Sequence, residues 1–546
     1  MSKGHPLSRS ELKLLIHDLW SQGRWLQLAT LDTFNTKLTA LEKAYIALAN
    51  CHIGEAEIAG QLLEELSTKR GIQNKLSHLL LASHNLNLSR GLQIIESGNN
   101  PSVIASNKAN RFSVQKINEI ELGNAWAGNT VNTVIFRHHA IFTDNYFQYT
   151  AFYLDEKTLR FIKRDLNGEA IEYYDLLGDY NLKDAHNSIS LGMDRDGFIH
   201  VCYDHHGSQL NYRRSLLPFD INGWTERLAM SGNNEKKVTY PTFILPKDNS
   251  ALLVLYRDGY WKRGSAYIKK YDEKNKVWDD CLLPVLSGED NIPWTSNPYW
   301  NTPVISGDGC LHMSFTWRTD YFDENKLVTN LNIDYAKSND EGLSWFTSND
   351  KIYKLPITQV NSETIWPVPP GSNNMNQNSM ALDSAGYPHI AYYSNDENGI
   401  PQYKHLWFDG VKWKNEVISN NKEKFDLRGS GTLNIPLSRP EIIIDEKDNV
   451  IVIFRSSGFD NKFVVNFLAS PDYIFHEDNC NILWDESVGQ AEPIIDRVRW
   501  ERDKILTLFI QYNDQPDNEG VPLLKLSPVK LVDFNIFSPG YVDNEK

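Results

Sequence analysis

Five residues that could do acid–base chemistry lie beside turns in the middle of the chain. They are His186 in DAHNSIS, His206 in YDHHG, Tyr240 in VTYPTF, Arg257 in LYRDG and Tyr299 in NPYW. Two imidazoles, two phenols and a guanidinium suit proton transfer on an anionic substrate if they meet in one place. Each lies at the end of a predicted strand, so polar strand ends that are satisfied by their neighbours are the alternative interpretation.

The elements that must bring these residues together are short strands. From about residue 105, β-branched and aromatic runs alternate with Asp, Asn and Gly turns. Four phrases place a tight turn before an apolar strand: DRDGFIHV (194–201), SGDGCLHM (306–313), DSAGYPHI (383–390) and DEKDNVIV (445–452). Tryptophans close the units at positions 224, 278, 345 and 413. Repeats that are built from strands and are as long as the spacing of these tryptophans predict propeller blades. The length of the whole region favours seven blades.

Two details of the repeats are structural. His200, His312 and His389 recur at one position of the repeated phrase, so we interpret them as parts of the blades and not as catalytic groups. The segment from Ser338 to Trp345 fits the Asp-box pattern S-x-D-x-G-x-[ST]-W, in which Asp and Gly form a hairpin turn and Trp packs between blades. The Asp-box therefore argues for the fold and not for an activity.

The first hundred residues have a different pattern. Between residues 8 and 97, leucines and other apolar residues recur at helical spacing, with glycines between the runs. The pattern predicts a small all-α domain of helical hairpins, tetratricopeptide-like, over residues 1–100. A mainly β domain, a seven-bladed β-propeller that carries the catalytic residues, is predicted over residues 105–546.

Bulk properties exclude some classes of function. The formal net charge of −15 disfavours nucleic acid as a partner, because binding to phosphates needs a basic surface. No apolar run approaches 18 residues, so no membrane span is predicted. The first residues lack the apolar core of a signal peptide, which favours a cytoplasmic location, with export by another route as the alternative. The five cysteines form no CxxC pair and are interpreted as free thiols.

Several stretches resemble the BNR-repeat family over about residues 120–515. They include AWAGNTVNTVIF (125–136), DAHNSISLGMDRDGFIHVCYDHH (184–206), VTYPTF, LYRDG, FTWRTD (315–320) and AEPIIDRVRW (491–500). This family includes seven-bladed ulvan lyases and rhamnosidase-like enzymes. The resemblance to the lyases implies an active site of two histidines, a tyrosine, an arginine and a further tyrosine, which correspond to His186, His206, Tyr240, Arg257 and Tyr299.

The resemblance implies cleavage of a uronic-acid-containing glycan by β-elimination. Arg257 would neutralise the uronate carboxylate, since a guanidinium stays charged and binds carboxylates bidentately. His186 would take the proton from C5 and Tyr240 would protonate the leaving O4, although these two roles could be exchanged. His206, counted with the catalytic residues, and Tyr299 would position the substrate or tune the other groups. Arg318, in FTWRTD, would hold a second anionic group or form an ion pair between blades.

Other functions stay open at this point. A glycoside hydrolase of the same propeller family, rhamnosidase-like, would need paired carboxylates, for which Asp184, Asp204 and Asp258 are available. A non-catalytic propeller that binds carbohydrate is the third possibility, with the N-terminal helices as a docking module for a protein partner. A sialidase is disfavoured because no F/Y-R-I-P phrase occurs. We expect an acidic polysaccharide or oligosaccharide as the ligand, no cofactor and no metal at the site, with a structural ion left open.

Overall fold

The second of two units contains almost all the residues that can be described. The computed structural model describes residues 46 and 112–537, except residues 138, 248–249, 261–262, 281–282, 290–295 and 321–323. The chain divides into two units at residues 109 and 110. The helical, tetratricopeptide-like domain predicted for residues 1–100 thus lies outside the described residues, apart from Ile46.

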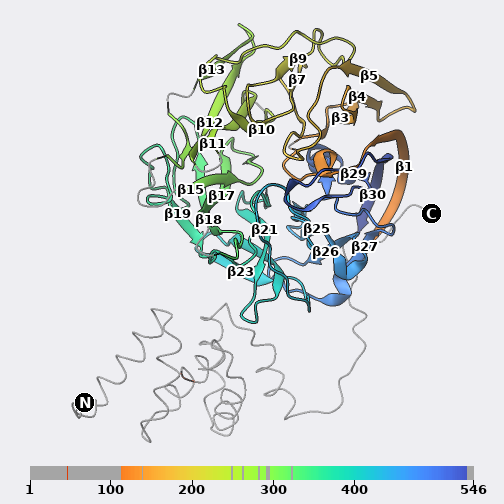
Figure 1. The fold of residues 1–546 in the computed structure, drawn as a ribbon. Coiled ribbons are helices and arrows are strands. Elements are labelled where there is room, and N and C mark those ends of the chain that lie inside the picture. Colours follow the sequence, from red (N-terminus) through yellow and green to blue (C-terminus); the bar gives the residue numbers. More distant parts are fainter. Residues whose placement is uncertain are drawn as a thin grey trace, which may run out of the picture. The chain divides into compact units, whose positions relative to one another are not determined.

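Seven antiparallel sheets form a ring, so that the described residues make up a seven-bladed β-propeller (Figure 1). This confirms the predicted mainly β fold and the number of blades. Blade 1 contains β2 (Ile141–Thr143), β3 (Phe147–Asp155), β4 (Thr158–Asp165) and β5 (Ile171–Leu177), and blade 2 contains β6 (Ser190–Met193), β7 (Ile199–Cys202) and β9 (Tyr212–Arg214). Blade 3 contains β10 (Val238–Ile244), β11 (Leu253–Tyr260), β12 (Arg263–Asp272) and β13 (Val277–Asp280), with β8 (His206–Ser208) beside β10 and β14 (Leu286–Ser287) beside β12.

The other four blades follow in order along the chain. Blade 4 contains β15 (Ser296–Trp300), β16 (Val304–Ile305), β17 (Leu311–Thr319), β18 (Asn330–Ser338) and β19 (Glu363–Trp366). Blade 5 contains β20 (Ser379–Leu382), β21 (Pro388–Asn395), β22 (Pro401–Phe408) and β23 (Trp413–Val417), and blade 6 contains β24 (Glu441–Ile444), β25 (Val450–Ser456), β26 (Lys462–Leu468) and β27 (Cys480–Trp484). Blade 7 contains β28 (Ile494–Ile495), β29 (Ile505–Gln511), β30 (Leu526–Phe537) and β1 (Ser113–Trp126).

Blade 7 closes the ring with strands from both ends of the propeller. Strand β1, which comes first in the chain, pairs with β30, which comes last, from Ser113 opposite Phe537 to Trp126 opposite Leu526. A closed ring leaves few exposed strand edges at which other chains could add. The pairing therefore fixes the two ends of the propeller to each other without a covalent link.

The repeated phrases of the sequence form the same turn in four blades. In each, a backbone N–H at the fourth residue donates to the carbonyl of the first, as from Gly197 to Asp194 at 3.0 Å and from Gly309 to Ser306 at 3.0 Å. Gly197 has φ +85° and Gly309 has φ +86°, a conformation that glycine adopts at little cost. The turn joins β6 to β7, β16 to β17, β20 to β21 and β24 to β25 in blades 2, 4, 5 and 6, which explains why the phrase recurs.

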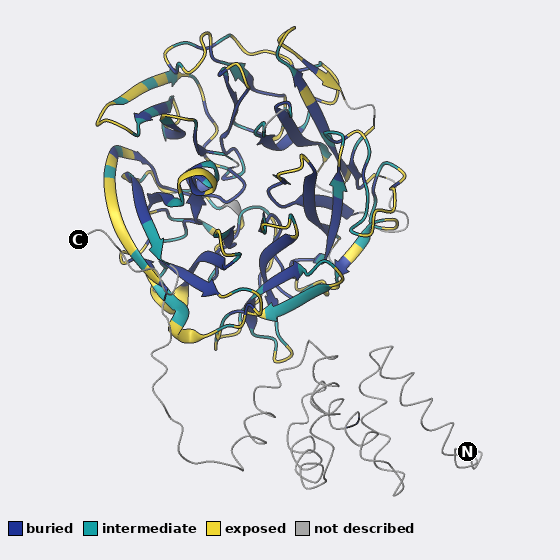
Figure 2. Cartoon of the chain, turned by 180° about the vertical axis from the view of Figure 1, so that it is seen from behind, coloured by how far each residue is buried: buried dark blue, intermediate teal, exposed yellow. Residues whose placement is uncertain are grey.

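The core lies between neighbouring blades. Strand β25 reads VIVIFRS and every one of its residues is buried, because a blade is covered on both faces. The outer strand β1 is mostly exposed (Figure 2). The tryptophans that close the units pack across the gaps, as when Trp278 of blade 3 contacts the ring of His200 in blade 2, with centroids 5.7 Å apart. In the Asp-box, Asp340 accepts from the Ser344 backbone N–H at 2.8 Å, and Trp345 is buried.

Helical residues are few in the described part of the propeller. They are α7 (Arg497–Asp503) between β28 and β29, and the short 3-10 turns η2 (Thr130–Asn132), η3 (Ser457–Phe459), η4 (Glu477–Asn479) and η5 (Asp517–Glu519). Within residues 112–537, where described, no helix is long and apolar enough to span a bilayer.

Candidate active site

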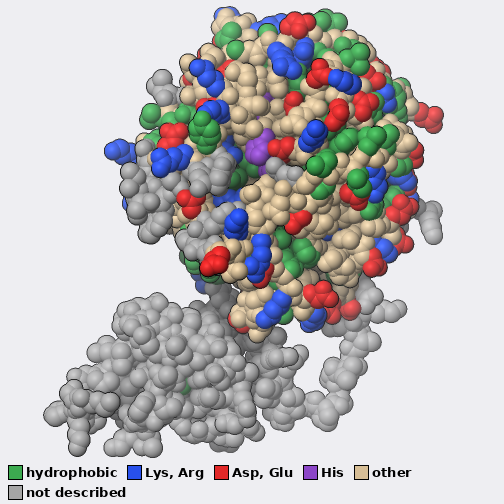
Figure 3. All heavy atoms as spheres, viewed as in Figure 1, with side chains coloured by type: hydrophobic (Ala, Val, Ile, Leu, Met, Phe, Trp, Pro, Cys, Tyr) green, Lys and Arg blue, Asp and Glu red, His purple; other side chains and the backbone are tan. Residues whose placement is uncertain are grey.

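One face of the ring carries the loops that lead into the innermost strands, and the predicted site residues meet there. We call it the site face and define it by His186, Thr432 and Glu492, which precede β6, β24 and β28. Histidine side chains reach the surface near the middle of this face, beside acidic side chains (Figure 3). The six predicted residues lie in or directly before blades 2, 3 and 4, and the contacts described below connect them.

The strand register explains part of this convergence. In blade 3, Thr239 of β10 lies opposite His206 of β8 on one side and Arg257 of β11 on the other. In blade 4, Arg318 of β17 lies opposite Asn297 of β15, two residues before Tyr299. Residues i and i+2 of a strand share a face, so Tyr299 and Asn297 point to the same side of their blade.

Two of the site histidines share one carboxylate. Asp184 Oδ1 lies 2.7 Å from His186 Nδ1 and also accepts from the His186 backbone N–H at 2.9 Å. Asp184 Oδ2 hydrogen-bonds to His206 Nδ1, and the two imidazoles stack with centroids 4.1 Å apart. Burial raises the pKa of Asp184, but the two histidines outweigh burial and hold the pKa below its ordinary value. A carboxylate that accepts from Nδ1–H fixes the tautomer in which Nε2 is the basic nitrogen.

Tyr240 lies on an irregular part of β10. The pairing of β10 with β11 shifts between Thr239 and Thr242, and Tyr240 has φ +57°. Such a bulge turns a side chain away from the regular alternation of a strand and is often found beside active sites. The Tyr240 ring lies 5.9 Å from His186 and 5.0 Å from Phe136, between centroids. Burial and the neighbouring Tyr299 raise the pKa of Tyr240, so its hydroxyl keeps its proton at neutral pH.

Arg257 is buried at the site with part of its guanidinium unsatisfied. It is 2% exposed, and its Nε and Nη1 have no hydrogen-bond partner among the described residues. Its Cζ lies 5.2 Å from the ring centroid of Tyr240 and 5.1 Å from that of Tyr299. Burial raises the pKa of Tyr299, but the charges of Arg257 and Arg318 outweigh burial and lower it. A buried cation with two unsatisfied nitrogens is costly unless an anionic group pairs with it.

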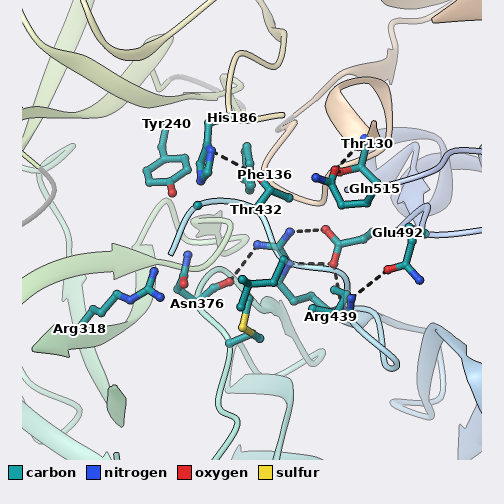
Figure 4. A pocket seen from close by; sticks show the side chains of 15 residues that line it. Thr130, Phe136, His186, Tyr240, Arg318, Asn376, Thr432, Arg439, Glu492 and Gln515 are labelled. Carbon is teal, nitrogen blue, oxygen red and sulfur yellow. Dashed lines mark hydrogen bonds and ion pairs between the residues drawn. The ribbon is translucent and has the colours of Figure 1, made fainter. Parts of the chain in front are cut away.

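The pocket beside His186 also contains residues that the sequence did not single out. Figure 4 shows His186 and Tyr240 across from Arg439 and Glu492, with Thr432 between them. Arg439 Nε donates to Glu492 Oε1 at 2.8 Å, and both side chains are buried. The cavity itself has a volume of about 30 Å³, roughly the share of one water molecule in liquid water. Arg439 belongs to SRPE and Glu492 to AEPIIDRVRW, and no local pattern in either phrase indicates that they meet.

The carboxylates considered for a hydrolase are engaged with their surroundings. Asp184 holds both histidines, as described above. Asp204 accepts from the Asn181 backbone N–H at 3.2 Å, and Asp258 accepts from the Lys237 backbone N–H at 2.7 Å. Burial raises the pKa of Asp204. These contacts fit the structural interpretation of all three aspartates better than a pair of carboxylates across a scissile bond.

Asp184 and the two histidines that it binds are the one group of possible metal ligands found among the described residues. One ligand atom from each of Asp184, His186 and His206 lies within 4.8 Å of the other two. One carboxylate and two imidazoles are a set that binds Zn²⁺ in other proteins. The hydrogen bonds between these atoms explain their arrangement without an ion, so the three residues fit a hydrogen-bonded group as well as a metal site.

Several known proteins with similar sequences or folds are polysaccharide lyases. An ulvan lyase of Alteromonas sp. (strain LOR) is 19% identical over 365 residues, which cover 61% of this chain and 73% of that protein. The crystal structure of the polysaccharide lyase Uly1 superimposes with a TM-score of 0.57 at 13% identity, covering 77% of this chain and 99% of Uly1. An ulvan lyase bound to –[GlcA(1-4)Rha3S]– gives a TM-score of 0.54 at 14% identity, covering 73% of this chain and 94% of that structure.

At these identities the solved structures establish the fold. The sequence profile of the BNR repeat-containing family matches residues 147–421, which are half of the chain and extend from β3 to the residues after β23. The matched region contains all six predicted site residues. The protein is therefore a member of the BNR repeat-containing family.

Proposed function

We propose that this protein is a polysaccharide lyase that cleaves a uronic-acid-containing glycan by β-elimination. The observation that supports this most is the buried Arg257 guanidinium, with two unsatisfied nitrogens, beside Tyr240. The Tyr240 ring in turn lies 5.9 Å from that of His186, which is held by a carboxylate. The similarity to ulvan lyases, one of them bound to a glucuronate-containing oligosaccharide, points to the same class of substrate.

Arg257 acts on the carboxylate of the uronate. The C5 proton of a uronate is weakly acidic until the adjacent carboxylate is neutralised, and a guanidinium can do this with two parallel hydrogen bonds. Because Arg257 is nearly inaccessible to water, its charge is less screened than that of a surface arginine. Arg318, which is half-buried, lies near the same tyrosine and would hold a further anionic group of the glycan.

His186 and Tyr240 move the protons. His186 Nε2 takes the proton from C5, the electrons of that C–H bond form the C4–C5 double bond, and the C4–O4 bond breaks. Tyr240 gives its phenolic proton to the departing O4, and the proton held by His186 later returns to the phenolate through solvent. Asp184 orients His186 and stabilises the imidazolium that forms, as a carboxylate does in other catalytic carboxylate–histidine pairs. His206 and Tyr299 flank these groups and position the sugar.

The reaction leaves a product that a hydrolase does not make. We expect a rise in ultraviolet absorbance from the unsaturated uronate when the protein is incubated with glucuronate-containing polymers or oligosaccharides. Mass spectrometry should show that the two products add up to the mass of the substrate without added water. Products that together exceed the substrate mass by one water would show hydrolysis instead. Binding without turnover across the whole panel would support the carbohydrate-binding alternative.

A further inference from the structure

A segment between blades 5 and 6 crosses the site face and contacts the proposed catalytic residues. It comprises Leu427–Ile435, and we call it the strap. Gly431, Thr432, Leu433 and Ile435 of the strap line the pocket. Thr432 Oγ1 lies 3.3 Å from His186 Nδ1, although the two residues are 246 positions apart in the sequence. The strap therefore forms a wall of the pocket that contacts the proposed base at Nδ1, the nitrogen that also faces Asp184.

The strap is held at both ends by loops of other blades. On one side, the Gly429 backbone N–H donates to the Lys326 carbonyl at 2.9 Å, and the Val328 N–H donates to the Leu427 carbonyl at 3.0 Å. On the other side, Ser430 N–H donates to Asn518 Oδ1 at 3.2 Å and Asn434 N–H donates to Asp517 Oδ1 at 3.0 Å. Lys326 and Val328 belong to the β17–β18 connection of blade 4, and Asn518 to the β29–β30 connection of blade 7. A segment with anchors on both sides is a fixed wall and not a free loop.

Enclosure by the strap limits which part of a glycan can reach the site. Tyr240 is 4% exposed and Tyr299 is 3% exposed, whereas the side chain of His206 is 31% exposed. Of these three side chains, that of His206 is therefore the one that solvent reaches most. An enzyme that cuts the interior of a polymer needs an open groove on both sides of the scissile bond. A pocket that is open on one side accepts the end of a chain or a short oligosaccharide.

We propose that the strap makes this protein an end-acting enzyme, which cleaves short oligosaccharides or the ends of acidic chains and not their interior. This inference rests on the proposed lyase function and adds the length of the substrate to it. The strap is then the element that determines specificity, and the contact between Thr432 and His186 marks the closed end of the pocket.

The strap can be loosened without touching the catalytic residues. A Cβ added to Gly429 would lie 1.8 Å from Asn518 Oδ1, the atom that accepts from Ser430, so Gly429→Ala should release the blade 7 anchor. Asn518→Gly removes the side chain that accepts this hydrogen bond, and glycine tolerates the φ of +53° at this position. Gly309→Ala is the matched control, because Gly309 also has positive φ, at +86°, and no atom lies within 4 Å of its added Cβ.

The test compares the solution viscosity of a uronate polymer with the number of double bonds formed. For the wild-type protein we expect short unsaturated products from the first minutes, with viscosity falling only in proportion to the mass released. Gly429→Ala and Asn518→Gly should both lower the viscosity more per double bond than wild type, while Gly309→Ala behaves as wild type. An early collapse of viscosity with a ladder of intermediate sizes in the wild type would overturn the inference and leave the lyase proposal standing. No unsaturated product from polymers or oligosaccharides would overturn both.

Discussion

At the scale of single residues, the site combines a buried cation with a carboxylate that organises two bases. Arg257 has unsatisfied nitrogens, whereas Asp184 is engaged with both histidines. A buried, partly unpaired charge costs stability, so its presence in a well-packed blade calls for a reason in binding. Function and stability should therefore respond differently to substitution at these two positions.

Arg257→Met should separate activity from stability. We expect lyase activity to fall by about 10²-fold or more, because the carboxylate loses its counter-charge. The free energy of unfolding should stay level or rise by about 1 kcal/mol, since the substitution removes unsatisfied buried donors. Arg455→Met is the matched control: Arg455 is also fully buried, but its Nε donates to the Ala491 carbonyl at 3.1 Å and its Nη2 to the Ile435 carbonyl at 2.8 Å. The free energy of unfolding of the Arg455→Met variant should fall by about 2 kcal/mol, measured by chemical denaturation. Equal destabilisation of both variants would argue against an anion site at Arg257.

Asp184→Asn should change the pH dependence of activity as well as its size. An amide cannot accept from two imidazole N–H donors as a carboxylate does, so we expect kcat to fall by about 10²-fold and the acidic limb of the pH profile to move. Asp204→Asn is the control, because Asp204 accepts from a backbone N–H and holds neither histidine. An unchanged pH profile in Asp184→Asn would mean that the carboxylate does not act through the histidines.

The lowered pKa of Asp184 also links this residue to acid stability. The folded protein binds a proton at Asp184 more weakly than the unfolded chain does. The resulting stabilisation is complete above the unfolded pKa of about 4 and is lost as the pH falls through the folded pKa. The difference in melting temperature between wild type and Asp184→Asn should therefore be largest near neutral pH and shrink in acid. A constant difference across this range would contradict the assignment.

At the scale of elements, the hairpin β11–β12 sets the position of Arg257. Gly264 of β12 lies against the Arg257 side chain, and a Cβ there would come within 2.6 Å of Arg257 Cδ. Gly264→Ala should displace the guanidinium and raise KM or lower kcat, with little change in melting temperature. Gly307→Ala is the control, since nothing lies within 4 Å of its added Cβ. Wild-type kinetics in Gly264→Ala would show that the position of Arg257 tolerates movement.

At the scale of the whole molecule, the closure of blade 7 makes the ring one cooperative structure. All seven sheets lie within residues 110–546, and β1 supplies the outer strand of the last one. We expect a protein that begins at residue 110 to unfold in a single transition and to keep its activity. A protein that begins at residue 127 lacks β1 and exposes the edge of β30, so it should aggregate or melt at a markedly lower temperature. Similar melting of the two proteins would show that β1 is dispensable.

Local patterns in the chain were enough to predict the propeller. A turn such as DRDGFIHV needs a residue with positive φ at a fixed offset, and a tryptophan closes several units, so each feature recurs in four of the seven blades. The types of the site residues were also readable, because His186, Tyr240 and Arg257 do not recur from blade to blade. The prediction that each lies at the end of a strand was wrong for two of them, since Tyr240 lies within β10 and Arg257 within β11. Such signals extend over only a few residues, so they can be recognised in the sequence without the three-dimensional structure.

Contacts between distant segments could not be predicted from the sequence, because they form only in the closed ring. The pairing of Arg439 with Glu492, the approach of Thr432 to His186 and the sharing of Asp184 by two histidines join residues whose sequence neighbours carry no mark of the contact. The unsatisfied state of Arg257 is likewise a property of its surroundings and not of the phrase LYRDG. The physical reason is that strand and turn preferences act over a few residues, whereas the depth and the open side of a pocket arise only when seven blades are packed around one axis.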